Sequence, residues 1–223
     1  MLERSNYLIR TFERIKLKSA PAYHRIISAN SKLVIEGPPR CGNSSALRLV
    51  VSNNPTYKKR IATHIHRSFQ IYYAMKYKVP AVVMLPSPKF STVSHASLLC
   101  QLGQVNATTP KEQEQLLKLC ILEYLVFTMN VFNLSFRQIV PFEEYIRNSS
   151  FLIEYLNREF FLGLVGAKQY QSQQISEAVH VFPSYERDLL KNHFVDILET
   201  STEVKQLLQS AQYFYEKLMT QKV

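Results

Sequence analysis

The stretch LVIEGPPRCGNSS, residues 33–45, joins a short apolar run to a loop of glycine and proline, and ALRLVV follows with the composition of a helix. Gly37 and Gly42 have the spacing of a Walker A phosphate loop, in which backbone N–H groups at a helix N-terminus hold the anion. Asn43 stands where that loop has its lysine, and Arg40 lies inside the loop instead. These residues predict a strand, an anion-binding loop and a helix, in that order.

The rest of the chain alternates apolar, β-branched runs with amphipathic stretches. Strands are expected over 32–36, 60–65, 79–85 and 136–142, and helices over 5–18, 43–51, 67–78, 91–102, 111–132, 143–161, 184–199 and 201–219. Strands that alternate with helices favour a parallel sheet with right-handed crossovers. Ligands of such sheets bind at the carboxyl ends of the strands. We therefore expect the loops after Glu36, His64 and Leu85 to converge on one site.

Composition limits the class of protein. The chain has 223 residues, of which 46% are hydrophobic, so it can bury one sizeable core. We expect an amphipathic extension over 1–30 and one α/β domain over 31–223. The sequence contains no uninterrupted run of about 18 or more apolar residues, so no membrane-spanning segment is predicted. Three cysteines without metal-ligand spacing favour a reducing compartment, and the predicted location is the cytoplasm.

The charge is unevenly distributed. Residues 37–111 contain ten Lys or Arg and no Asp or Glu, which predicts a polyanion site or, alternatively, a basic surface without a specific ligand. Nucleic acid is disfavoured as a partner, because the aromatic residues of this window gather in the helical stretch 69–77, where core packing explains them. The N-terminal amphipathic helix is basic, and peripheral contact with a membrane is a further option for it.

The loop lacks the other groups of a nucleoside-triphosphate enzyme. Such an enzyme needs the loop lysine and a carboxylate that holds magnesium at the end of a neighbouring strand. Here Asn43 replaces the lysine, Pro86 follows the strand over 79–85, and no carboxylate occurs in 37–111. The sequence therefore predicts a loop that binds a phosphate group without a metal ion.

The loop resembles the 5′-phosphosulfate loop of the sulfotransferases, whose pattern is P-[K/R]-S-G-T-[T/S]. Pro39, Arg40, Gly42 and Ser44 match this pattern, while Cys41 and Asn43 replace its serine and threonine. Further segments are similar in the same order: ATHIH (62–66) to K-T-H-L-P, LPSPKFSTVSH (85–95) to the 3′-phosphate segment, VPFEEYIR (140–147) to the segment after the fourth strand, and ERDLLKNHF (186–194) to the C-terminal motif. The resemblance covers roughly residues 32–218.

The resemblance implies a three-layer P-loop NTPase-like fold with a central parallel sheet, flanking helices and a helical C-terminal part. It implies metal-independent transfer of a sulfuryl group from 3′-phosphoadenosine 5′-phosphosulfate to a hydroxyl or amine of a small-molecule, carbohydrate or lipid acceptor. Arg40 and His64 are the implied catalytic residues, with His64 as general base. The residues implied to bind the sulfuryl donor are Pro39, Arg40, Cys41, Gly42, Asn43, Ser44, Ser45, Ser94 and Arg187.

One position departs from the family pattern. Pro86 stands where the family has an arginine for the 3′-phosphate, and proline cannot replace a bidentate guanidinium contact. Either Arg187, Lys89 or another cation compensates, or the sulfuryl donor binds weakly. Two alternatives remain open at this point. One is a P-loop nucleotide or nucleoside kinase with displaced catalytic groups, and the other is a catalytically inactive nucleotide-binding protein of the sulfotransferase type.

Overall fold

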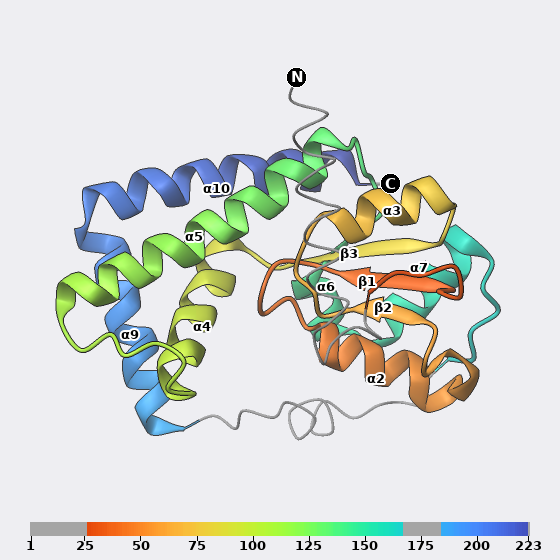
Figure 1. Ribbon diagram of the computed structural model, residues 1–223, viewed down its shortest axis with the longest axis horizontal. Coiled ribbons are helices and arrows are strands. Elements are labelled where there is room, and N and C mark those ends of the chain that lie inside the picture. The colour runs from red at the N-terminus through yellow and green to blue at the C-terminus, as the bar shows by residue number, and fades with distance from the viewer. Residues whose placement is uncertain (1–25, 167–183, 223) are drawn as a thin grey trace.

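The computed structural model describes residues 26–166 and 184–222, and the helix expected over 5–18 lies outside them. Four short parallel strands form one sheet (Figure 1). Their order across the sheet is β2 (Ile61–Thr63), β1 (Leu33–Glu36), β3 (Ala81–Leu85) and β4 (Ile139–Pro141). Every strand residue is buried, as is expected of parallel strands that are covered on both faces.

Alternate residues of the central strand contact different helical layers. Val34 belongs to the core formed with α3 (Phe69–Tyr77), α4 (Pro88–Gln101), α5 (Pro110–Asn133), α9 (Tyr185–Thr200) and α10 (Thr202–Gln221). Leu33 and Ile35 belong to the core of the opposite face, with α2 (Asn43–Asn53) and α7 (Ser150–Phe160). The short helix α6 (Phe142–Arg147) adds Tyr145 to this second core. The chain is therefore an α/β protein with helices on both faces of a parallel sheet.

The connections explain where a ligand can bind. Strand β1 leads through α2 and the short 3-10 helix η2 (Pro55–Tyr57) to β2 on one side, and β2 returns through α3 to β3 on the other side. Right-handed crossovers to opposite sides of β1 require the helices to lie on opposite faces, and α2 and α3 do so. Such a reversal opens a crevice at the carboxyl ends of the strands. Figure 1 shows α4 and α9 beyond the end of β3.

The element order expected from the sequence is confirmed in the described residues, with differences at the boundaries. The second strand ends at Thr63 instead of residue 65, because His64 and His66 have φ values of 63° and 55° and cannot continue it. The helix expected over 143–161 is two helices, since Asn148 has an extended backbone between α6 and α7. Its side-chain oxygen accepts the N–H of Ser150, at 3.1 Å, at the start of the second helix.

Helix α5 is the long core helix of the first layer. A capping box fixes its start, because the Thr109 hydroxyl accepts the N–H of Glu112 and the Glu112 carboxylate accepts the N–H of Thr109. Its length and composition alone would also suit a membrane crossing. Its buried residues, however, pack into the core beside α4 and α10, as those of a long core helix do.

The first described residues join the same core. Ile26 and Ile27 are buried beside α3, and the N–H of Ile27 donates to the side-chain oxygen of Gln70 at 2.7 Å. The end of the 1–30 segment is therefore packed on the α/β domain.

Candidate functional site

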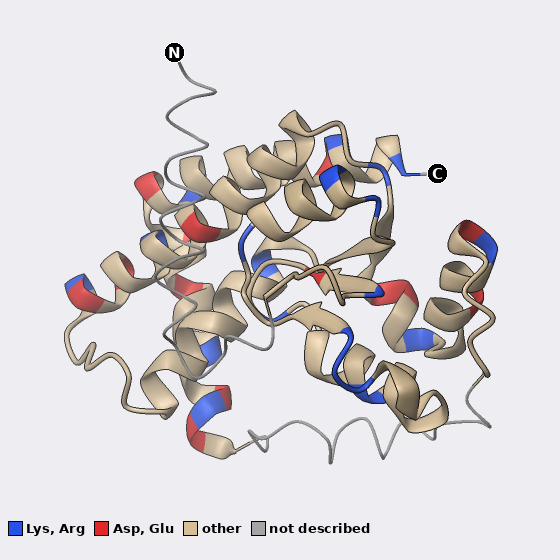
Figure 2. Cartoon of the chain, turned by 45° about the vertical axis from the view of Figure 1, so that its right-hand side comes forward, with Lys and Arg blue, Asp and Glu red and all other residues tan. Residues whose placement is uncertain are grey.

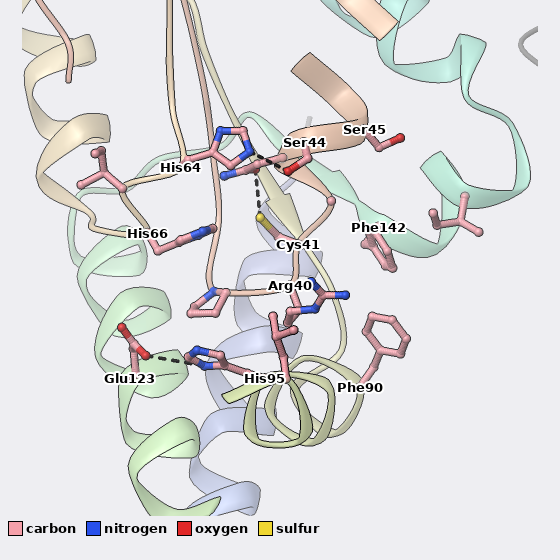
Figure 3. A pocket seen from close by; sticks show the side chains of 16 residues that line it. Arg40, Cys41, Ser44, Ser45, His64, His66, Phe90, His95, Glu123 and Phe142 are labelled. Atoms are coloured by element: carbon pink, nitrogen blue, oxygen red, sulfur yellow. Dashed lines mark hydrogen bonds and ion pairs between the residues drawn. The ribbon is translucent and has the colours of Figure 1, made fainter. Parts of the chain in front are cut away.

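A cavity of about 370 Å³ lies at the carboxyl ends of the strands. Its walls come from the loop after β1, the loop after β2, and helices α2, α4, α5 and α6 (Figure 3). The lining residues are Pro39–Ser45, His64–His66, Phe90, His95, Leu98, Glu123, Phe142 and Ile146. The predicted convergence of the loops after Glu36 and His64 is confirmed, whereas the loop after Leu85 does not line the cavity and only α4, which follows it, does. Arg40 lies between the histidines on one side and Phe90 and Phe142 on the other.

The loop after β1 is shaped by two glycines. A Cβ on Gly37 would lie 2.2 Å from the backbone oxygen of Met84, so the loop leaves β1 in direct contact with β3. Gly42 has φ 84° and caps α2, and a Cβ there would lie 2.7 Å from Cε2 of Phe142. As the N-cap, Gly42 has no side chain that could accept a hydrogen bond from α2, and it is itself a wall of the cavity. The N-terminus of this helix therefore faces the cavity with the partial positive charge that attracts anions.

Arg40 connects the loop to two distant helices. Its Nε donates to Oγ of Ser94 in α4 at 3.0 Å, and Nη2 of Arg187 in α9 donates to the same hydroxyl at 3.2 Å. Ser94 and Arg187 are 5% and 4% exposed and lie behind Arg40, outside the cavity wall. The structure therefore brings together three predicted site residues that are far apart in the sequence.

The positive charge of this cluster is only weakly compensated, since the charge of Asp188 acts on Arg187 without forming an ion pair. In the described part of the chain, neither Arg40 nor Arg187 has a carboxylate within ion-pair distance, and Nε of Arg187 has no hydrogen-bond partner there. Burial, and next the charge of Arg187, lower the pKa of Arg40 to about 10. Both guanidiniums are still charged at neutral pH, and a bound anion would relieve their repulsion.

The two cations expected to compensate for Pro86 differ in position. Pro86 is buried, and its carbonyl accepts the Tyr124 hydroxyl at 2.8 Å. Lys89 is directed toward solvent, with 55% of its side chain exposed, and pairs with Glu199 at 3.4 Å. Of these two candidate cations, Arg187 is the one that reaches Ser94.

The remaining predicted loop residues have distinct contacts. The Cys41 thiol is buried and donates to Oδ1 of Asn43 at 2.9 Å, and burial raises its pKa far above the ordinary range, so it stays protonated. Nδ2 of Asn43 is left without a partner among the described residues, although Asn43 borders the cavity. Oγ of Ser45 is 2.6 Å from the Tyr145 hydroxyl, whose pKa burial raises to about 12. Ser45 is thus engaged with α6.

A buried carboxylate that the sequence reasoning passed over holds the loop after β2. Glu36, at the end of β1, has no exposed surface, and its two oxygens accept the N–H groups of Ile65 and His66 at 2.9 Å each. Nε2 of Gln70 lies 3.5 Å away as a further donor. Burial raises the pKa of Glu36, while the His66 charge and these donors oppose the rise. The only sign of this role in the sequence is that a charged residue, Glu36, ends an apolar strand.

Two histidines of this loop line the cavity in different ways. Nε2 of His64 is 2.8 Å from Oγ of Ser44, so His64 contacts the first turn of α2. Nδ1 of His66 is 2.9 Å from the carbonyl oxygen of Gly37. Because a carbonyl only accepts, Nδ1 of His66 carries the hydrogen.

His95, the third histidine that lines the cavity, was not predicted from the sequence. Nδ1 of His95, in α4, lies 3.7 Å from a Glu123 carboxylate oxygen, and Arg67 forms an ion pair with the other oxygen of Glu123. Burial lowers the pKa of His95, although the Glu123 charge opposes this change. These residues come from separate elements, and no local pattern in the sequence links them.

The basic window does not form a single patch. Figure 2 shows Lys and Arg without Asp or Glu from the loop after β1 through α4, and the acidic residues lie mainly on the helices that follow. Of the ten cations in this fully described window, Arg40 lines the cavity. Residues 58–60 precede β2 and so lie at the opposite end of the strands. The local charge at Arg40 is therefore a better indicator of a ligand than the total charge.

No protein-family model matches this chain, and no curated protein or solved structure matches it either. The assignment of a function therefore rests on the contacts of the cavity and on the sequence motifs.

Proposed function

We propose that this protein is a metal-independent sulfotransferase of the P-loop-like type, which uses 3′-phosphoadenosine 5′-phosphosulfate as sulfuryl donor. The observation that carries the proposal is the meeting of Arg40 and Arg187 on the Ser94 hydroxyl, beside an uncapped helix N-terminus. A half-buried and a buried cation that share one neutral hydroxyl favour a multiply charged anion. A nucleotide with phosphates at two positions supplies negative charge both at the start of α2 and beside Arg40 and Arg187.

The proposed binding mode divides the phosphates between two places. The 5′-phosphosulfate lies on the backbone N–H groups at the start of α2, with the Asn43 amide and the Ser44 hydroxyl as further donors. The 3′-phosphate reaches Ser94 and Arg187 from the cavity when Arg40 moves, and it displaces the 3.2 Å hydrogen bond that joins these two residues. Arg40 exchanges its contact with Ser94 for the bound phosphate groups.

The transfer step is an in-line displacement at sulfur. The acceptor oxygen forms a bond to sulfur, and the bond from sulfur to the bridging oxygen of the phosphosulfate breaks. The electron pair stays on the leaving phosphate of adenosine 3′,5′-bisphosphate, where Arg40 neutralises the developing charge. The acceptor proton passes to a histidine of the cavity, since imidazole is a suitable base near neutral pH.

A binding titration tests the donor site. Adenosine 3′,5′-bisphosphate should bind in chelator, and it should bind more tightly than adenosine 5′-monophosphate, which lacks the 3′-phosphate. Arg187→Ala should remove most of this preference, about ten- to a hundredfold, because it removes a charge-assisted contact worth about 1.5–3 kcal/mol. Arg158→Ala is the matched control, since Arg158 is exposed on α7 and pairs with Glu159. Equal affinity for both nucleotides would contradict the proposal.

Turnover separates the proposal from its two alternatives. A kinase should transfer phosphoryl groups and stop in chelator, whereas sulfuryl transfer should continue. An inactive nucleotide-binding protein should bind adenosine 3′,5′-bisphosphate but transfer no sulfuryl group to any member of a panel of phenols, alcohols, sugars and amines.

A further inference from the structure

His66 is held in one orientation by two independent contacts. Its backbone N–H donates to the buried Glu36 carboxylate at 2.9 Å, and its ring Nδ1 donates to the carbonyl of Gly37 at 2.9 Å. Both partners belong to the end of β1 and the start of the loop that follows it. The ring is therefore fixed on the same backbone that would carry the phosphosulfate.

The hydrogen on Nδ1 decides the state of the other ring nitrogen. A neutral imidazole carries one N–H, so Nε2 of His66 has the lone pair. His66 lines the cavity, and Figure 3 shows its ring extending from the loop toward Arg40 and Cys41. A base with a fixed tautomer and a lone pair on the cavity side can accept a proton without reorganisation.

The two neighbouring histidines are less suited to this role. Nε2 of His64 is in hydrogen-bond contact with Ser44 at 2.8 Å, on the side of the site where the sulfuryl donor is proposed to bind. His95 has Nδ1 at 3.7 Å from Glu123, which is longer than a hydrogen bond. His66 therefore differs from both in having its tautomer fixed by a carbonyl group.

We infer that Nε2 of His66, and not His64, accepts the proton of the acceptor hydroxyl, with Glu36 as the residue that positions its loop. This inference rests on the proposed sulfotransferase function. In the step, the acceptor O–H bond breaks and its proton moves to Nε2, while the oxygen–sulfur bond forms and the bridging sulfur–oxygen bond breaks. The leaving group is adenosine 3′,5′-bisphosphate, and His66 afterwards releases the proton to solvent. His64 instead positions Ser44 on the loop.

The first test needs no turnover. Nitrogen NMR of the histidine rings of the full chain, recorded at about pH 8 to keep imidazoles neutral, should show His66 protonated at Nδ1 and unprotonated at Nε2. His66→Gln identifies the signal by its loss. A His66 ring that is protonated at Nε2 would overturn the inference.

The second test measures transfer and binding in the same variants. His66→Ala should lower turnover by about 10²–10⁴, and added imidazole should restore part of it, which a purely structural role would not allow. Affinity for adenosine 3′,5′-bisphosphate should change by less than about twofold, because Nε2 faces the acceptor. His193→Ala, on α9 outside the cavity, is the control and should retain activity.

The outcomes separate the two claims. If the protein without substitutions transfers no sulfuryl group, the proposed function is wrong, and the role of His66 as a base is wrong with it. Two results with an active protein without substitutions would show that only the role of His66 is wrong. In the first, His66→Ala is as active as that protein. In the second, His66→Ala is inactive and imidazole does not restore its activity, while imidazole does restore the activity of His64→Ala.

Discussion

The loops after β1 and β2 face the same cavity but are held by opposite means. The loop after β1 is fixed by close backbone packing at Gly37, and its cation Arg40 has a hydroxyl as partner instead of an acid. The loop after β2 is fixed by the buried carboxylate of Glu36, which binds its backbone N–H groups. The first arrangement leaves positive charge available, and the second leaves an imidazole available. One side of the cavity is therefore suited to an anion, and the other to a proton.

The largest expected effect is on the second loop. Glu36→Leu leaves the N–H groups of Ile65 and His66 buried without an acceptor, at a cost of about 1–3 kcal/mol each. We expect the free energy of unfolding in urea to fall by about 2–6 kcal/mol, from a total that is typically about 5–15 kcal/mol. Glu36→Gln keeps the shape and one accepting oxygen, and it should lose clearly less. Equal losses in the two variants would mean that packing, not hydrogen bonding, holds this loop.

The pH dependence of stability tests the same carboxylate. Burial raises the pKa of Glu36 above 4.5 in the folded protein, so the folded state holds a proton that the unfolded chain has already released. The contribution of Glu36 to stability must then decrease as pH rises from 4.5 through the folded pKa. The measurement is the difference in unfolding free energy between the unchanged protein and Glu36→Gln over a pH series. We expect the unchanged protein to lose stability relative to the variant as pH rises, and a constant difference would argue against a raised pKa.

The next effect concerns the cation of the first loop. Arg40→Ala should weaken binding of adenosine 3′,5′-bisphosphate by about ten- to a hundredfold, since a charge-assisted contact contributes about 1.5–3 kcal/mol. The fold should remain intact, because Arg40 is only half-buried and has no acid partner among the described residues. Arg48→Ala, in α2 but outside the cavity wall, serves as the matched control in the same titration. If Arg40→Ala and Arg48→Ala bind adenosine 3′,5′-bisphosphate with similar affinity, Arg40 is not part of the binding site.

The smallest effect is expected at Lys89. This lysine is more than half exposed and pairs with the exposed Glu199, and exposed pairs contribute about 0–1 kcal/mol. Lys89→Ala should therefore change nucleotide affinity by less than about fivefold. A loss as large as that of Arg187→Ala would show that Lys89, too, compensates for the absence of an arginine at Pro86.

The sequence predicted the features that depend on local pattern. The strand at 33–36, the glycine loop and the helix from Asn43 follow from hydrophobic runs and from the spacing of Gly37 and Gly42. Ser94 and Arg187 were included through the resemblance to sulfotransferases, and the structure brings both to Arg40.

The features that the sequence did not predict depend on distant contacts. The ion pairing of Glu123 with Arg67, and its approach to His95, join three separate elements. The role of Glu36 depends on N–H groups that lie 29 and 30 residues away along the chain. The early end of the second strand follows from the backbone angles of His64 and His66, which hydrophobic patterning does not encode.

The Ser94 hydroxyl is shared by Arg40 and Arg187, which come from two distant parts of the chain. This shared contact has a consequence for local unfolding of the helices around the site. Helix α9 lies near the C-terminal end of the sequence, yet its Arg187 contacts Ser94 of the proposed nucleotide site. A ligand that neutralises both guanidiniums would stabilise α9 and α2 together, because it binds only when both are in place. Amide hydrogen exchange in α9 should then slow on nucleotide binding. In the proposed enzyme, release of the spent nucleotide would be coupled to transient detachment of α9, whose Arg187 lies 147 residues after Arg40 of the loop.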